Sequence, residues 1–277
     1  MQNLHTLKHR LGMLIVPLSL FGLTACSDDE QPAMRPMLPA DGASTVRSIT
    51  HLGDVLTGYD WNFTYADGRL VSANGMMRDP DPTLDRSFSY TSQLSYGPWN
   101  VSVYNSSGEQ VDLQLSTQGY IERMTVNRNI YVFYYRDGRL TGWEKTVFEN
   151  SFGQVQQYRS SATISYDNGD ISRIDYVGAD DEPVTVLFTS SALSNRNGLL
   201  PEGVGQEMGC LGFEQLYYAG LLGRPTTHLV ERVTFNYSEH PDRDYTIDFE
   251  YSTQNGNVTL CNYHTPNGGV ASVSYGY

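Results

Sequence analysis

The chain has 277 residues and a formal net charge of −13 at pH 7, and it contains 20 tyrosines and 26 glycines. An acidic surface of this kind argues against nucleic-acid binding, which needs a basic footprint, and against electrostatic attachment to anionic lipid. Abundant Tyr, Val and Thr favour strands, and Gly favours turns, so the composition predicts a mainly β protein long enough to bury a sizeable core.

The N-terminus has the layout of an export signal. A basic segment, residues 8–10, precedes an apolar run at 11–22, which is shorter than the ~20 residues of a membrane-spanning helix. The sequence Leu-Thr-Ala-Cys follows at residues 23–26 and resembles a bacterial lipobox, in which the signal is cut before a cysteine that then carries lipid. The resemblance implies a signal peptide over residues 1–25 and lipidation of Cys26. An ordinary signal peptide that ends in cysteine is the alternative.

The segment after the lipobox predicts a tether. Residues 26–48 are rich in Pro, Ser, Asp and Ala and lack periodicity, which is typical of a flexible linker. Ser27 occupies the position where an aspartate would favour retention in the inner membrane. The acidic residues 28–30 are similar to the tag of surface-exported lipoproteins in Bacteroidetes-like bacteria. We therefore expect attachment to the outer membrane through lipid, with one β domain, residues 49–277, facing the periplasm or the exterior.

One hairpin pattern recurs through this domain. Residues 135–140 read Tyr-Arg-Asp-Gly-Arg-Leu, and Asp-Gly between extended runs predicts a type I′ turn, whose two central residues both adopt φ > 0. Looser copies occur at residues 65–70 and 166–171, and versions with longer turns are predicted at 148–155 and 251–258.

Alternating apolar and polar residues predict many further strands with one buried face. The predicted strands cover residues 59–65, 69–75, 88–96, 99–104, 111–115, 121–126, 130–135, 140–148, 158–166, 171–177, 184–188, 230–237, 245–251, 258–263 and 270–277. Consecutive hairpins of this number predict a many-stranded antiparallel meander that forms a curved sheet or partial barrel. The alternation is compatible with a sheet that closes and with one that stays open.

The strand pattern breaks at residues 199–224. Apolar residues from Phe213 to Leu221 recur at helical spacing, and Gly and Pro at 223–225 provide a stop signal, so one helix is predicted near residues 207–222. Its internal glycines cost about 1 kcal/mol each relative to alanine. We therefore expect this helix to depend on packing against the sheet.

These motifs resemble known families. The spaced Tyr-x-x-Gly-Arg-Leu turns look like those of tyrosine-aspartate repeat proteins. Together with Leu-Tyr-Tyr-Ala-Gly-Leu-Leu-Gly-Arg-Pro at 216–225 and Val-Thr-Phe-Asn-Tyr at 233–237, they resemble Bacteroidetes lipoproteins of unknown function with a porin-like fold. The resemblance covers about residues 50–277. It implies a many-stranded antiparallel sheet curled like a partial barrel, and it brings no catalytic residues.

The remaining reactive residues give weak signals. Cys210 and Cys261 have two interpretations, a disulfide formed in an oxidising compartment or two small buried hydrophobic residues. The histidines lack metal-ligand spacing, so we expect no metal and no cofactor. Three aspartates at residues 79–85 are interpreted as a proline-stiffened surface turn rather than a calcium site.

Three tryptophans and two carboxylates are candidates for sugar chemistry. Trp61, Trp99 and Trp143 could stack on sugars, but Trp61 lies on an aromatic core face and is interpreted as structural, and burial in the core is also the commoner role for the other two. Asp248 and Glu250 lie on one face of a predicted strand, about 7 Å apart. Such a pair could serve glycoside hydrolysis, although carboxylates on the polar side of a strand are usually only solvated.

The leading hypothesis is a non-enzymatic, lipid-anchored cell-envelope protein. Its expected partners are the membrane, through lipid at Cys26, and a glycan, an apolar ligand or another envelope protein, but no nucleic acid. The alternatives are a surface polysaccharide hydrolase and an outer-membrane pore.

Overall fold

The computed structural model describes residues 45–53, 60–78, 87–151, 154–179, 181–210, 212–266 and 268–277, all within one compact unit, Gln31–Tyr277. The predicted signal peptide, Cys26 and the aspartate turn at 79–85 lie outside the described residues. In the part of the chain that is described, every helix is too short or too polar to cross a membrane.

The described residues form sixteen strands and two short helices. The strands are β1 Ser48–Gly53, β2 Asp60–Ala66, β3 Arg69–Arg78, β4 Ser87–Tyr96, β5 Asn100–Asn105, β6 Gln110–Leu115, β7 Ile121–Val126, β8 Asn129–Arg136, β9 Arg139–Ser151, β10 Gln154–Asp167, β11 Asp170–Val177, β12 Pro183–Ser194, β13 His228–Tyr237, β14 Tyr245–Gln254, β15 Asn257–His264 and β16 Val270–Gly276. The helices are α1, Glu214–Tyr218, and a 3-10 turn, Pro241–Arg243.

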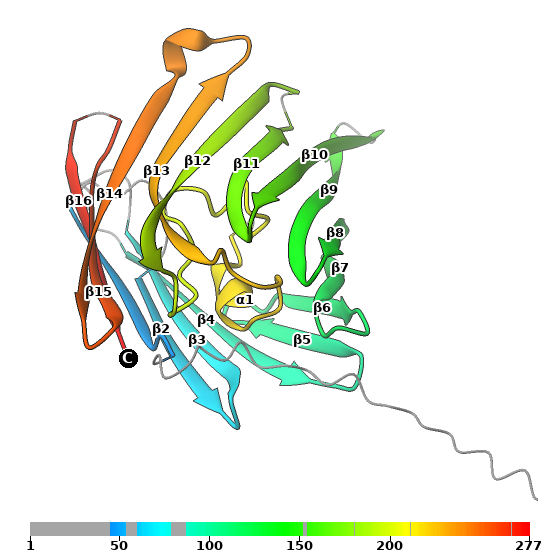
Figure 1. The fold of residues 1–277 in the computed structure, drawn as a ribbon. Coiled ribbons are helices and arrows are strands. Elements are labelled where there is room, and N and C mark those ends of the chain that lie inside the picture. The colour runs from blue at the N-terminus through cyan, green and yellow to red at the C-terminus, as the bar shows by residue number, and fades with distance from the viewer. Residues whose placement is uncertain are drawn as a thin grey trace, which may run out of the picture. The chain divides into compact units, whose positions relative to one another are not determined.

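Each strand pairs antiparallel with the next, and β1 pairs with β16, so the sheet closes into a barrel (Figure 1). The predicted antiparallel meander is therefore confirmed. The closing strand β1 was not predicted, because its six residues show only a short alternation. It brings Ile49 opposite Tyr275 of β16.

The predicted Asp-Gly hairpins are confirmed. At the turns at 67–68, 137–138, 168–169 and 255–256, the Asp or Asn has φ between +50° and +53° and the following Gly has φ between +74° and +91°. These are the left-handed angles of a type I′ turn. The turn at 255–256 is therefore tighter than the longer turn predicted there.

A bulge follows each of these four turns, since the register shifts by one residue on the returning strand. In three of them the extra residue is Ser or Thr, and its hydroxyl donates to the carbonyl of the residue across the hairpin. These pairs are Thr141 to Tyr134 (3.2 Å), Ser172 to Ser165 (3.2 Å) and Thr259 to Ser252 (3.3 Å). Bulges of this kind increase the local twist of the strands, which helps the sheet to curl.

Most of the buried strand side chains are apolar and face the barrel interior, although some apolar side chains, such as Met76, Val155 and Leu187, are exposed. On β14, Ile247 and Phe249 are buried, whereas Thr246, Asp248 and Glu250 between and beside them are exposed. The predicted alternation therefore has its buried face toward the interior.

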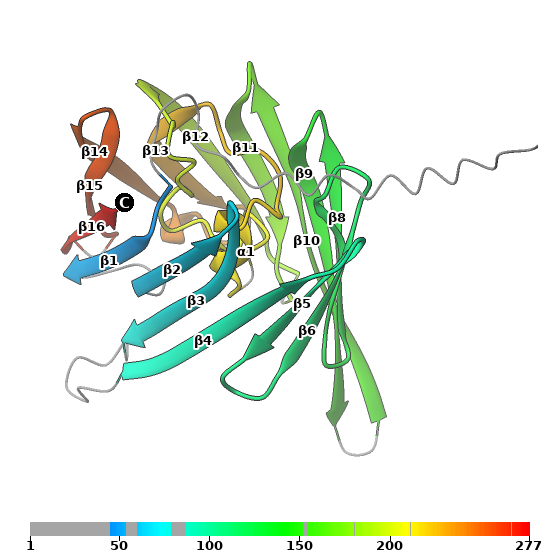
Figure 2. The same ribbon diagram turned by 90° about the horizontal axis from the view of Figure 1, so that it is seen from below.

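Residues 195–227 between β12 and β13, of which 211 is not described, form a segment that we call the plug. The plug carries α1 into the ring of strands (Figure 2). Its Gln215 amide donates to Ser92 Oγ of β4 at 3.1 Å, and Trp143 Nε1 of β9 donates to the Glu207 carbonyl at 2.8 Å. Two separate strands of the barrel, β4 and β9, thus hold the plug.

The helix predicted near 207–222 lies in the plug and is shorter than expected. It has five residues, because Gly209 and Gly212 before it adopt φ of +78° and +86°, which a helix does not contain. Residues 215–218 are buried, which agrees with the expectation that the helix depends on packing.

Candidate functional site

A pocket lies between the plug and the first two strands. It has an empty volume of about 410 Å³, which includes the solvent at its mouth. The residues that line it are Ile49, His51, Trp61, Leu200, Pro201, Glu202, Gly203, Gly205, Glu214 and Tyr218. Aromatic and aliphatic walls with a few convergent polar groups are typical of small-molecule sites.

His51 of β1 joins the barrel wall to the plug. Its backbone N–H donates to Asp60 Oδ1 at 2.7 Å, and its Nδ1 lies 3.3 Å from the same oxygen. Its Nε2 lies 3.3 Å from Glu202 Oε2, and the Tyr275 hydroxyl donates to Glu202 Oε1 at 3.0 Å. Both ring nitrogens thus face carboxylates, which accept hydrogen bonds from two donors only when the imidazole is protonated.

The pKa of His51 reflects this arrangement. Burial lowers the pKa, but hydrogen bonding and charge from Glu202 and Asp60 outweigh burial, and the net result is a pKa raised above 6.5. The side chain is 8% exposed, and those of Asp60 and Glu202 are 19% and 11% exposed. A carboxylate at each ring nitrogen, both poorly solvated, therefore favours the protonated form of His51.

Glu214, the first residue of α1, contributes a third carboxyl to the pocket. Its Oε2 is buried and has no hydrogen-bond partner among the described residues. Burial raises the pKa of Glu214, and the negative charge of Glu202 raises it further. A buried acceptor without a donor is costly, so this oxygen is positioned to receive one from a bound molecule.

The apolar wall of the pocket belongs to a fixed aromatic cluster. The rings of Trp61 and Phe63 stack with centroids 5.8 Å apart, and Tyr90 meets Trp61 edge-on at 6.2 Å. Tyr218 of the plug lies 5.1 Å from the Phe63 ring. The wall is thus held in place by contacts outside the pocket.

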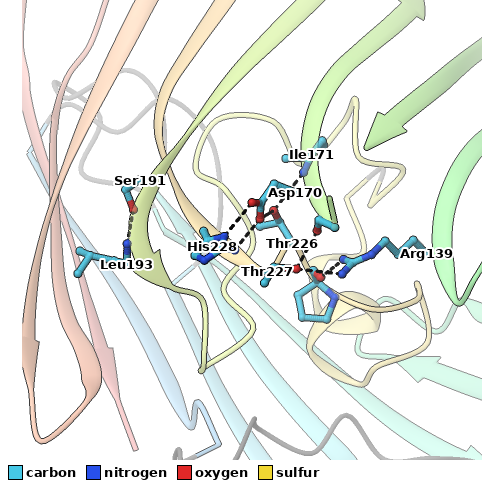
Figure 3. A network of polar contacts seen from close by, with 10 residues as sticks. Arg139, Asp170, Ile171, Ser191, Leu193, Thr226, Thr227 and His228 are labelled. Carbon is cyan, nitrogen blue, oxygen red and sulfur yellow. Dashed lines mark hydrogen bonds and ion pairs between the residues drawn. The ribbon is translucent and has the colours of Figure 1, made fainter. Parts of the chain in front are cut away.

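A second histidine–carboxylate pair fastens the end of the plug (Figure 3). Asp170 accepts hydrogen bonds from the His228 backbone N–H at 2.7 Å, His228 Nδ1 at 2.8 Å and Thr226 Oγ1 at 3.2 Å. Arg139 donates to the Pro225 carbonyl and to Thr227 Oγ1. We call Asp170, Thr226 and His228 the latch, and we assign it a structural role because its groups satisfy one another.

The structure separates the candidate residues that the sequence suggested. Cys210 and Cys261 are buried free thiols, and burial raises the pKa of both. Their oxidation to a disulfide stays a prediction. Trp143 is buried, with its indole N–H bonded to the plug, while Trp99 is 48% exposed.

The carboxylates suggested for hydrolysis lie on the outer face of the barrel. Asp248 Oδ1 accepts a hydrogen bond from Arg232 Nε of the neighbouring strand at 2.6 Å, and both side chains are more than half exposed. Glu250 is exposed on the same face. The structure therefore places this pair outside the pocket.

Apart from Trp61, which the sequence assigned to an aromatic core face, the pocket residues were not found from the sequence. His51 lies in the strand that was not predicted, and Glu202 and Glu214 lie 151 and 163 positions away from it, in the plug. The break in strand pattern at 199–224 is the signal that marks this segment. No local spacing connects it with β1.

The fold and the pocket define a class: a closed antiparallel barrel whose interior is filled by a plug, with a small polar pocket between plug and wall. The chain belongs to the family described as "Domain of unknown function (DUF4595) with porin-like fold", whose model matches residues 63–262. This confirms the resemblance inferred from the sequence.

A solved structure shares this fold. A porin-like protein from Bacteroides uniformis is 18% identical, with a TM-score of 0.66, and the match covers 84% of this chain and 98% of that one. A porin-like protein from Bacteroides vulgatus is 12% identical, with a TM-score of 0.49, over 84% and 99% of the two chains. None of the curated proteins matches the chain significantly.

Proposed function

We propose that the protein is a lipid-anchored cell-envelope protein whose plugged barrel binds a small polar molecule without transforming it. The observation that carries this proposal is the pocket beside Trp61, which is faced by the buried His51 imidazole, the Glu202 carboxylate and a Glu214 oxygen that has no partner among the described residues. Polar groups gathered at a site with an apolar wall are suited to orienting a ligand.

The arrangement around His51 supports binding rather than nucleophilic catalysis. In a serine or cysteine hydrolase, one imidazole nitrogen meets a carboxylate and the other takes a proton from the nucleophile. Here the second nitrogen of His51 faces Glu202 instead. Because an imidazolium between two carboxylates has no basic lone pair, it is not suited to act as a general base.

The two alternatives receive less support. The hydrolase hypothesis depended on Asp248 and Glu250, which lie on the outer face. A pore requires a passage and an outward apolar band, whereas the plug occupies the interior and the outer face of β14 carries Asp248 and Glu250. A barrel with this outer face is suited to an aqueous compartment, held near the membrane by a tether.

The anchor rests on the lipobox-like sequence that ends at Cys26 and on the tether that follows it. The similar structure from Bacteroides uniformis is a porin-like protein, and this agrees with the expected location in the cell envelope. Growth with an alkyne-labelled fatty acid should label the wild-type protein and leave Cys26→Ser unlabelled. Label on the Cys26→Ser protein would contradict the assignment.

A stability screen tests binding. The mature chain should be melted in the presence of glycans, lipids, amines and divalent ions, because a ligand at 100 times its Kd adds about 2.7 kcal/mol to the free energy of unfolding. A shift that is lost in Glu214→Gln and kept in Glu250→Gln would support the pocket. If no compound shifts the melting of a well-folded sample, scaffolding of another envelope protein becomes the better explanation.

A further inference from the structure

The charge of the pocket is unbalanced. Among the described residues that line it there are two carboxyls, Glu202 and Glu214, and no lysine or arginine. Asp60 adds a third carboxyl through its contact with His51. Because His51 supplies the one positive charge and is already shared by Asp60 and Glu202, Glu214 is left without a compensating partner.

The missing partner is a hydrogen-bond donor, and a donor that carries a positive charge suits a site with several carboxyls best. Glu214 Oε2 is a buried acceptor that none of the described residues satisfies, and an anion placed there would meet Glu214 and Glu202 together. A neutral hydroxyl would satisfy the hydrogen bond but not the charge. An ammonium group supplies three donors and the positive charge.

The wall beside these carboxyls suits the rest of such a molecule. Trp61, Ile49 and Leu200 give an apolar surface next to Glu202 and Glu214. An aromatic face attracts a neighbouring cation, and the effect is largest for tryptophan.

From these observations we propose that the pocket binds an organic amine, with the ammonium group at Glu214 and Glu202 and an apolar stem against Trp61. This inference rests on the proposed binding function and specifies the chemical class of the ligand. The step is reversible association, with no bond made or broken.

Three probes of matched size test the class: n-butylammonium, n-butanol and butyrate. They should be titrated into the full chain, purified in detergent and labelled with 5-fluorotryptophan, and followed by fluorine NMR. The chain has three tryptophans. Trp61 lines the pocket and Trp99 is exposed, so Trp99 serves as an internal control for surface binding. Replacing Trp61 by Phe assigns its resonance.

We expect butylammonium to shift the Trp61 resonance at a concentration at least tenfold lower than butanol, and butyrate to have no effect. Glu214→Gln, which keeps the shape and removes the charge, should reduce the affinity for butylammonium at least tenfold. Glu250→Gln on the outer face should leave it unchanged. An amine preference that survives Glu214→Gln, or equal binding of butanol, would overturn the inference.

The failures of the two proposals are distinguishable. If butanol, butyrate or a glycan shifts Trp61 and Glu214→Gln alters that response, the pocket binds ligands and the amine class is wrong. If none of the probes shifts Trp61 and no compound raises the melting temperature, both the amine class and the binding function are wrong.

Discussion

At the scale of single residues, the plug packs closely against the barrel wall at Gly209, which lies beside Trp143. The indole N–H of Trp143 donates to the Glu207 carbonyl, and a Cβ placed on Gly209 would lie 2.7 Å from Trp143 Cδ1. Gly209 is therefore required twice, for its φ of +78° and for the lack of a side chain against the ring. Trp143, weighed as a sugar platform, serves instead as a support for the plug.

The two reasons for glycine at position 209, its backbone conformation and its close packing on Trp143, can be distinguished by experiment. Gly212 has a similar φ of +86° and nothing within 4 Å of a Cβ placed on it. Gly212→Ala should therefore cost only the left-handed strain, about 1–2 kcal/mol. Gly209→Ala should cost about 1–3 kcal/mol more, because the methyl group overpacks against Trp143. Urea unfolding of both variants measures the difference, and equal losses would show that the wall yields to the methyl group.

At the scale of elements, the hairpin turns do more than reverse the chain. The Arg224 N–H donates to the Gly138 carbonyl at 2.7 Å and the Thr227 N–H to the Gly169 carbonyl at 3.1 Å, so two type I′ turns bind the returning end of the plug. The plug ends also meet each other, since the Asn195 N–H donates to the Thr227 carbonyl at 2.8 Å. The latch adds Asp170, directly after the second turn.

Removing the latch carboxylate should loosen the plug. Asp170→Asn retains one acceptor but loses the charge that His228 and Thr226 donate to, and we expect a cost of about 1–2 kcal/mol at pH 7. Asp175→Asn is the matched control on the same strand, because Asp175 pairs with Arg173 on the outer face, where the side chains are about half exposed, and it should cost less than about 0.5 kcal/mol.

The pH dependence of the Asp170 effect has a definite sign. Burial alone would raise the pKa of Asp170, but hydrogen bonds from His228 and Thr226 outweigh it, so the pKa lies below its ordinary value of 3.8. A depressed pKa gives stabilisation that is fully present above about pH 4 and lost as the pH falls through the lower, folded-state value. The difference between wild type and Asp170→Asn should therefore shrink below pH 4. A difference that stays constant down to pH 2 would contradict the charge-based explanation.

Local patterns in the sequence predicted most of the strands and turns but not the long-range contacts between them. The Asp-Gly turns and the alternation on strands such as β14 depend on neighbouring residues, so periodicity and turn chemistry predict them. Closure through β1 and the contact of His51 with Glu202 depend on partners more than 150 positions away, which no periodicity records. The long predicted helix became a five-residue one because tertiary contacts such as Gly209 on Trp143 outweigh apolar spacing.

At the scale of the whole molecule, the barrel separates two kinds of acidic residue. The carboxylates of the outer face, such as Asp248, are exposed to water or paired with arginine. Three others, Glu202, Glu207 and Glu214, belong to the plug inside the closed sheet, and burial raises the pKa of Glu207 and Glu214. The stability of the folded protein therefore depends on whether these buried carboxyl groups are protonated.

Glu207 gives the clearest test of this dependence. Burial raises its pKa to about 7. Between about pH 4.5 and pH 7 the folded state therefore binds a proton that the unfolded chain has released, so the free energy of unfolding falls as the pH rises through this range and levels off above it. Glu207→Gln, which resembles the protonated form, should match wild type near pH 5 and exceed its stability by about 1–3 kcal/mol at pH 8, since one pKa unit corresponds to 1.36 kcal/mol.

Glu250→Gln on the outer face should show no such pH-dependent gain. Chemical unfolding of the three proteins at pH 5 and pH 8 measures the effect, and an equal difference between Glu207→Gln and wild type at both pH values would show that the carboxyl of Glu207 ionises in the folded protein at its ordinary pKa.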